Sequence, residues 1–269
     1  MDWILTERRR LHSLFGVFLA PEVSAAIVPL ARPALRLGGR GKAVRLGGTP
    51  LLPPDAPWPR WAGRPLDFLA VVDFAELAAV LPQPDIPRSG RAAFYYASRV
   101  PRPWGSRAEE RDGWRVFTGD LVETTPPEGV RCAPPRTLDA VPFLSLPAPQ
   151  EPVLQRVESR YTGILAVYEQ LYAAWLQHIW PDDPVHQVGG WPVVVQRPVT
   201  AEAEHASSGR DPDLPLPPPD QADVDEWCHL LQLDSDERLG WHWGDPGRVY
   251  FCSRRSAPLE DSWLILQAR

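Results

Sequence analysis

The chain is poor in cysteine and almost without lysine. Three cysteines occur among its 269 residues, and no two have the spacing of a zinc knuckle or a redox pair. This pattern argues against a disulfide framework and fits a reducing compartment, so we expect a cytoplasmic protein. Lys42 is the only lysine, and arginine supplies the other basic side chains. We interpret that bias as a compositional habit rather than a sign of function.

Long hydrophobic runs are absent as well. None reaches the roughly 18 apolar residues that a membrane-spanning helix needs. The arginines Arg8–Arg10 precede an apolar stretch, as in a secretion signal, but Glu7 and Pro21 interrupt that pattern. The apolar residues there follow helical spacing instead. We therefore expect an N-terminal helix and no membrane partner.

Positive charge is in deficit overall. The formal net charge is −6, whereas proteins that bind nucleic acid without sequence preference present a basic face. We therefore expect no nucleic-acid partner.

Known catalytic and metal-binding signatures are also missing. The chain has no Gly-x-Ser-x-Gly elbow, no phosphate-binding glycine loop and no pair of histidines with metal-ligand spacing. Asp234 and Asp236 could open a calcium loop, but Arg238 and Leu239 stand where a further oxygen ligand and a glycine are needed. We predict no cofactor and no metal, and we find no positive indication of an enzyme.

Proline and tryptophan are abundant, with 33 and 12 residues. Prolines between apolar segments favour short elements joined by rigid loops. We expect the polar, proline-rich segment 202–225 to be an exposed loop, and the proline-rich region 126–152 to be an embellishment on the fold. The apolar spacing from Tyr161 to Ile179 predicts one continuous helix.

Three short patterns occur twice, in the same order. They are VRLGGTPLL (44–52) with HQVGGWPVV (186–194), FLAVVD (68–73) with HLLQLD (229–234), and GRAAFYY (90–96) with GRVYFCS (247–253). Each Gly-Gly turn is expected to need a positive φ or a close approach of the backbone. The patterns predict a mostly antiparallel α+β fold with an internal duplication. Two helix-plus-strands pseudo-repeats, about 5–125 and 155–269, would form one compact domain over residues 1–269.

These patterns carry a resemblance to a known family. HQVGGWP, LLQLDSD and WGDPGRVYF, with RLGGTPLLP and LAVVDFAEL, resemble the YwqG-like family of bacterial proteins of uncharacterised function. The resemblance runs from about Ala43 to the C-terminus. It implies a soluble α+β fold with internal duplication, and it implies no reaction.

The candidate site lies around the second copy of the strand patterns. Its residues are Asp234, Asp236, Trp241, His242, Trp243, Asp245, Arg248 and His186. In a structural interpretation, Asp-Pro-Gly at 245–247 forms a turn with a positive φ at its glycine, and 240–244 pairs with 248–252 as a hairpin. Arg248 would then pair with Asp234 or Asp245.

In a functional interpretation, these side chains rim a pocket in which tryptophan offers a flat face and arginine grips a carboxylate or phosphate. We expect the structural role to come first.

The function these observations favour is binding without catalysis. We expect a cytoplasmic protein whose acidic, tryptophan-rich loops contact another protein, for example as an immunity factor that neutralises a basic toxin. The alternative is an enzyme or a small-molecule-binding protein with a pocket between the duplicated halves.

Overall fold

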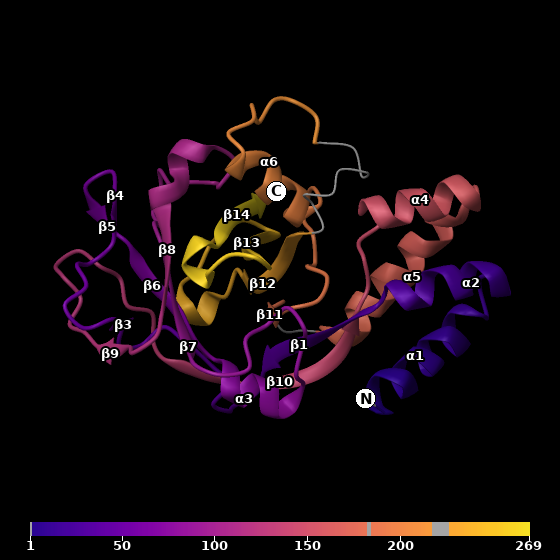
Figure 1. The fold of residues 1–269 in the computed structure, drawn as a ribbon, viewed down its shortest axis with the longest axis horizontal. Helices are drawn as coiled ribbons and strands as arrows, with labels where there is room; N and C mark the ends of the chain where they lie inside the picture. Colours follow the sequence, from indigo (N-terminus) through magenta and orange to yellow (C-terminus); the bar gives the residue numbers. More distant parts are fainter. Residues whose placement is uncertain (1, 182–183, 217–225) are drawn as a thin grey trace.

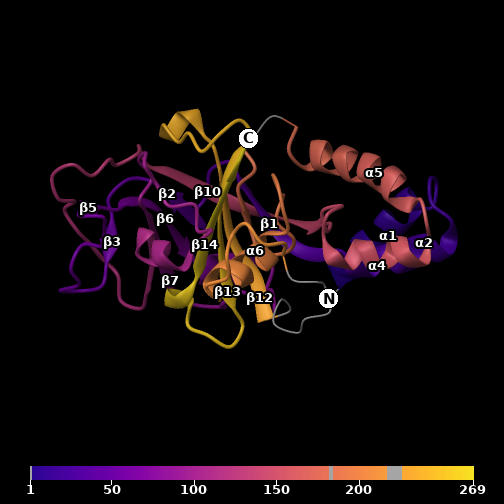
Figure 2. The ribbon, with the colours of Figure 1, turned by 90° about the horizontal axis from the view of Figure 1, so that it is seen from above.

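A computed structural model describes residues 2–181, 184–216 and 226–269. A ten-stranded antiparallel sheet forms the body, and a group of helices lies at one end of it (Figures 1 and 2). These helices, which enclose an apolar core of their own, are α1 (Asp2–Phe15), α2 (Pro21–Ile27), α4 (Pro152–Arg160) and α5 (Ile164–Ile179). Within the described residues, every helix is too short or too polar to cross a bilayer.

The sheet has two ordered arms that meet at its centre. From one edge to the other the strands are β14 (Trp263–Ala268), β13 (Gly247–Arg254), β12 (Trp227–Asp234), β11 (Gln187–Val188), β1 (Arg32–Gly38), β10 (Arg136–Ser145), β2 (Val44–Leu46), β6 (Asp67–Asp73), β7 (Arg91–Tyr96) and β8 (Trp114–Thr118). Short ribbons pair β3 (Leu51–Leu52) with β9 (Val122–Glu123) and β4 (Arg60–Trp61) with β5 (Arg64–Pro65). The expected mostly antiparallel α+β fold is confirmed.

The sheet curls until its two edges almost meet. The ring of Trp114 on β8 lies 5.0 Å from that of Trp263 on β14, and the Trp114 indole N–H donates to the carbonyl of Ser262 at 3.0 Å. Between the arms, Phe94 and Phe251 pack with their ring centroids 4.9 Å apart. Strands β6 and β7 are nearly continuous apolar runs because both of their faces are buried: one packs in the core between the arms, and the other in a second apolar cluster. The result is a sheet nearly closed into a barrel.

The two arms share local detail. Asp73 at the end of β6 lies opposite Arg91 on β7, and Asp234 at the end of β12 lies opposite Arg248 on β13. A register shift interrupts each strand pair between the residues that lie five and three positions before its aspartate. The strand order is also symmetric about the central β1–β10 pair, with β2, β6, β7 and β8 beyond β10, and β11, β12, β13 and β14 beyond β1.

Both Gly-Gly turns have the predicted backbone. Gly47 and Gly48 have φ of +61° and +75°, and Gly189 and Gly190 have φ of +69° and +65°. Residues with a Cβ avoid this region, so both sequence copies need glycine here for the same steric reason.

The proline-rich region 126–152 is not an embellishment, because it contains the central strand β10. At Pro142 this strand pairs with Leu35 of β1 on one side, while β2 pairs only with residues 136–138 on the other. Proline lacks an N–H and fits a strand position where one side has no partner strand.

The segment 202–225 is also not simply an exposed loop. Its first part continues helix α6 (Val199–Ser207), in which Glu202 and Glu204 are buried. Glu204 accepts hydrogen bonds from the Trp227 indole at 2.6 Å and from Arg254 at 2.9 Å. These partners lie far along the chain, so a polar sequence became a buried helix through pairing that local patterns do not reveal. Residues 217–225 lie outside the described part of the chain.

The predicted helix 161–179 begins later than expected. Gly163 has a φ of +89°, and the Glu158 carboxylate accepts from the N–H groups of Gly163 and Leu165 at 2.6 and 2.9 Å. This cap starts α5 and separates it from α4. The remaining helical segments of the described residues are α3 (Phe74–Val80), η1 (Val28–Leu30), η2 (Ala108–Gly113), η4 (Glu237–Leu239) and η5 (Leu259–Asp261).

Candidate functional site

Asp236, just after β12, is the centre of a buried ionic network. Its side chain is 1% exposed and accepts hydrogen bonds from Arg136 Nη1 at 2.6 Å and from Arg238 Nε at 3.0 Å. The main-chain N–H of Arg238 donates to the same carboxylate at 3.0 Å and so caps η4. Because Arg136 belongs to β10, the network joins the centre of the sheet to the loop after β12.

His186 is a further member of this network and contacts Asp236. Its Nδ1 accepts the main-chain N–H of Asp234 at 3.1 Å, so the proton of the neutral ring is on Nε2. That nitrogen lies 3.5 Å from Oδ2 of Asp236. His186 is buried, and both of its nitrogens are engaged. It therefore positions Asp236 rather than facing solvent.

The Asp236 carboxyl is ionised at neutral pH. Burial acts to raise its pKa, but the hydrogen bonds from His186 and Arg238 outweigh burial and hold the pKa well below the ordinary value. A carboxyl with a depressed pKa stabilises the fold above its unfolded pKa, and that contribution is lost as the pH falls toward the folded pKa.

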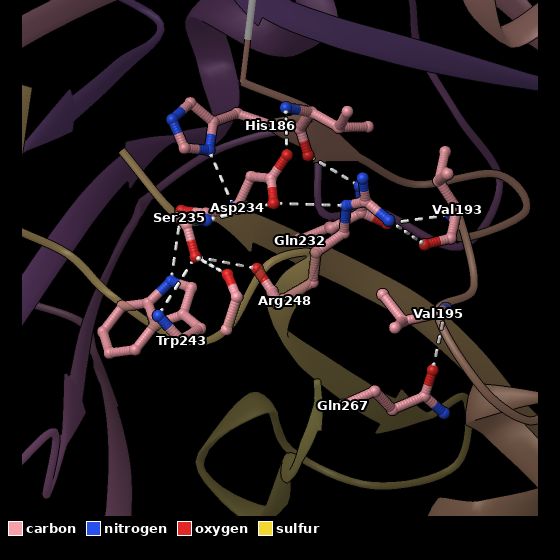
Figure 3. Close-up of polar contacts among 12 residues, drawn as sticks. His186, Val193, Val195, Gln232, Asp234, Ser235, Trp243, Arg248 and Gln267 are labelled. Atoms are coloured by element: carbon pink, nitrogen blue, oxygen red, sulfur yellow. Dashed lines mark hydrogen bonds and ion pairs between the residues drawn. The ribbon is translucent and has the colours of Figure 1, made fainter. Parts of the chain in front are cut away.

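Asp234 and Arg248 form the expected ion pair (Figure 3). Arg248 Nε lies 3.4 Å from Asp234 Oδ1, and both side chains are largely buried. Asp234 also accepts the main-chain N–H of Val185 at 2.8 Å, and Arg248 donates to the carbonyl of Val193 at 3.3 Å. The pair thus ties the end of the β12–β13 ladder to the segment that follows α5.

We expect Asp234→Asn and Arg248→Ala each to lower the free energy of unfolding by about 1–3 kcal/mol, because each leaves a largely buried partner unpaired. In a double-mutant cycle followed by urea denaturation, the coupling should be about 0.5–3 kcal/mol. Asp245→Asn is the matched control, because Asp245 is exposed. Strictly additive effects would show that the pair is not an energetic unit.

The segment 240–244 does not form the predicted hairpin with 248–252. It folds back on η4, where Asp236 and Trp241 exchange main-chain hydrogen bonds of 3.1 Å, while β13 pairs with β12 and β14. The physical reason is burial of the indoles: Trp241 is 7% exposed and Trp243 is 2% exposed. The positive φ also falls at Gly244, at +156°, and not at Gly247.

Trp243 is fixed from both arms of the sheet. Its indole N–H donates to the Asp234 carbonyl at 3.1 Å, and its ring packs 5.9 Å from Tyr96 of β7. Arg102 lies over the same ring and donates to the carbonyls of His242 and Trp243, each at 2.8 Å. The loop after β7 and the loop after η4 are therefore joined.

An open cleft of about 760 Å³ lies where these two loops meet. One side comes from residues 67–68, 98–100, 102 and 131–134, and the other from residues 238–243. Its walls thus come from both arms of the sheet. The buried network around Asp236 adjoins this cleft, because Arg238 lines the cleft and also pairs with Asp236.

The charge of the cleft is opposite to that of the whole protein. Its lining contains four arginines and one aspartate; the arginines are Arg99, Arg102, Arg131 and Arg238. The aspartate, Asp67, is already satisfied by Ser98, by the Arg131 N–H at 3.0 Å and by Arg99 at 3.4 Å. Within the described residues, the Arg131 guanidinium has no hydrogen bond or ion pair. The Arg131 guanidinium therefore remains available to an anion, while Arg99, Arg102 and Arg238 already have partners within the protein.

The sequence-predicted residues divide into three groups. Trp241, His242 and Trp243 line the cleft. Asp234, Asp236, Arg248 and His186 form the supporting contacts behind it, and Asp245 is exposed and does not line the cleft. The four arginines were not predicted, because they come from separate segments and have no motif in common. Their only signal in the sequence is the general excess of arginine over lysine.

Metal-ligating side chains do not gather here or elsewhere in the described ranges. Across residues 2–181, 184–216 and 226–269, no group of three or more His, Cys, Asp or Glu side chains is placed to hold a metal ion. Asp236, the most buried carboxylate of the site, is paired with Arg136 and Arg238.

The fold and cleft define an α+β protein with a nearly closed antiparallel sheet and a basic cleft between its arms. The chain belongs to the DUF1963 family, a domain of unknown function, whose profile matches residues 44–259. No curated protein matches the chain in sequence. The matched region contains the whole cleft.

Proposed function

We propose that the protein acts by binding, and that the cleft holds an anionic part of its ligand. The observation that carries this proposal is the ratio of four arginines to one aspartate in the cleft of a chain whose net charge is −6. Guanidinium groups bind carboxylates and phosphates with charge-assisted, often bidentate, hydrogen bonds. Asp236 holds Arg238 in a fixed orientation, which reduces the entropy lost when an anion binds.

The side chains of the cleft support binding rather than catalysis. Burial, followed by the negative charge of Asp67, raises the pKa of the Cys132 thiol above its ordinary value, so it is a poor nucleophile at neutral pH. Ser98 donates to Asp67, and the buried His186 has both nitrogens engaged. These groups lack the paired nucleophile and base of covalent catalysis.

We expect citrate and pyrophosphate, used as probes, to bind in isothermal titration calorimetry at low salt, with weaker affinity as salt rises. The double variant Arg131→Gln/Arg238→Gln should bind about tenfold more weakly or worse, since it removes two charged donors. Arg88→Gln/Arg156→Gln removes two exposed arginines outside the cleft and should bind like the parent chain. Equal affinities of the two double variants would refute the proposal.

A protein partner bound through acidic tryptophan-rich loops, including the immunity-factor case, stays a prediction. Trp241 and Trp243 are buried, so they do not offer the partner surface that we expected from the sequence. The cleft accords better with the alternative expectation of a pocket between the two halves.

We also infer that the sheet arose by duplication, and that the chain is a YwqG-like member of its family. The repeated Gly-Gly turns, the matching aspartate–arginine register and the symmetric strand order support the duplication.

A further inference from the structure

The cleft adjoins two further hollows. A hollow of about 230 Å³ shares Asp67, Ser98 and Arg99 with the cleft and extends it to Arg64 and Gly129. A hollow of about 800 Å³ shares residues 132–134 and extends it toward β3 and β9. All three hollows border the segment 129–135, and we refer to the three together as the groove.

Positive charge is distributed along this groove rather than focused at one point. The lining of the three hollows contains six arginines and two carboxylates; the arginines are Arg45, Arg64, Arg99, Arg102, Arg131 and Arg238. Asp67 lies between the first two hollows, and Glu123 lies in the third. A compact dianion would contact only part of this set, whereas an extended ligand with several negative charges would contact arginines in successive hollows.

The rest of the lining distinguishes between two kinds of extended polyanion. Single-stranded nucleic acid binds by stacking its bases on exposed aromatic rings, and the rings of the groove are buried, including Trp241, Trp243 and Phe68. Val100, by contrast, is 79% exposed at the rim, and prolines form much of the wall of the third hollow. These apolar surfaces suit the side chains and methylene groups of a peptide.

We propose that the groove binds an extended acidic peptide segment of a partner protein. The segment lies along residues 129–135, and its carboxylates pair with arginines in successive hollows. This inference rests on the proposed function, because the central cleft supplies most of the arginines. The inference adds the chemical class of the ligand. It also assigns a role to Arg64, which would contact only a ligand long enough to reach the first hollow.

The test uses blocked glutamate peptides of two and eight residues, with citrate and an eight-residue thymidine oligonucleotide as comparison probes. We expect octaglutamate to bind the intact chain at least about tenfold more tightly than diglutamate or citrate, because it reaches additional arginines. Arg64→Gln should weaken octaglutamate severalfold and leave diglutamate and citrate unchanged. Arg60→Gln is the control, because Arg60 is exposed and lies outside the groove.

The outcomes separate the two proposals. If citrate and diglutamate bind as tightly as octaglutamate, and Arg64→Gln has no effect, the ligand is compact: the proposed function stands and the peptide inference fails. If the oligonucleotide binds as tightly as octaglutamate, the groove does not select a peptide and the inference fails. If no probe binds, both proposals fail.

Discussion

Replacing Asp236 with alanine is expected to lower the free energy of unfolding by about 3–5 kcal/mol, the usual cost of removing one partner from a buried charge network. The substitution leaves Arg136, Arg238 and His186 without their shared carboxylate. It also removes the cap of η4, which adds about 1 kcal/mol to the loss. Urea denaturation measures the change, and Asp245→Ala, at an exposed position, should stay within about 0.5 kcal/mol of the parent chain.

The effect should also depend on pH in a defined direction. The pKa of Asp236 is depressed in the folded protein, by the hydrogen bonds from His186 and Arg238 against the opposing effect of burial. Its stabilising contribution is therefore complete above the unfolded pKa of about 4 and declines as the pH falls below it. The stability difference between the parent chain and Asp236→Asn should accordingly shrink between about pH 4 and pH 2. A constant difference over that range would show that the carboxylate charge is not the stabilising element.

Gly190→Ala is expected to cost about 2–5 kcal/mol. The residue has a φ of +65°, where a Cβ adds roughly 1–2 kcal/mol of strain. That Cβ would lie 2.3 Å from Ser145 Oγ and 2.7 Å from the Cβ of Ala34, and overpacking adds about 1–3 kcal/mol. Ser145 has little freedom to move, because its hydroxyl donates to the Arg32 carbonyl and accepts the Trp191 N–H.

Gly209→Ala is the matched control for this prediction. Gly209 has nearly the same φ, +69°, and no atom lies within 4 Å of the added Cβ. Its substitution should therefore cost only the backbone strain, about 1–2 kcal/mol. Thermal and urea unfolding of both variants separate strain from crowding, and equal losses would mean that the turn at Gly190 is not tightly packed.

Where local rules decide the structure, the sequence predicted it well. The strand ends at Asp73 and Asp234 lie where the apolar runs stop, and the Gly-Gly turns need glycine because of their backbone angles. The pairing of Asp234 with Arg248 also follows from their positions, since two adjacent antiparallel strands place them opposite each other.

The features that the sequence did not reveal depend on contacts between distant segments. Glu204 is buried in helix α6 because Trp227 and Arg254 donate hydrogen bonds to it. The spacing of residues near Glu204 does not indicate those distant partners. The turn at 240–244 folds inward because Trp243 finds a hydrogen-bond acceptor and an aromatic neighbour in the core. The basic cleft also depends on contacts between distant segments, because its arginines come from separate parts of the chain.

The most direct test of the central claim is a two-dimensional ¹⁵N spectrum of the tryptophan indole N–H groups during a titration with citrate. Signals are assigned by single Trp→Phe substitutions. If the cleft holds the anion, the signals of Trp241 and Trp243, which line it, should move and saturate together. The signals of Trp3 and Trp175, which pack in the helical group, should stay in place. Saturable shifts confined to the helical group, or no shifts at any citrate concentration, would contradict the account.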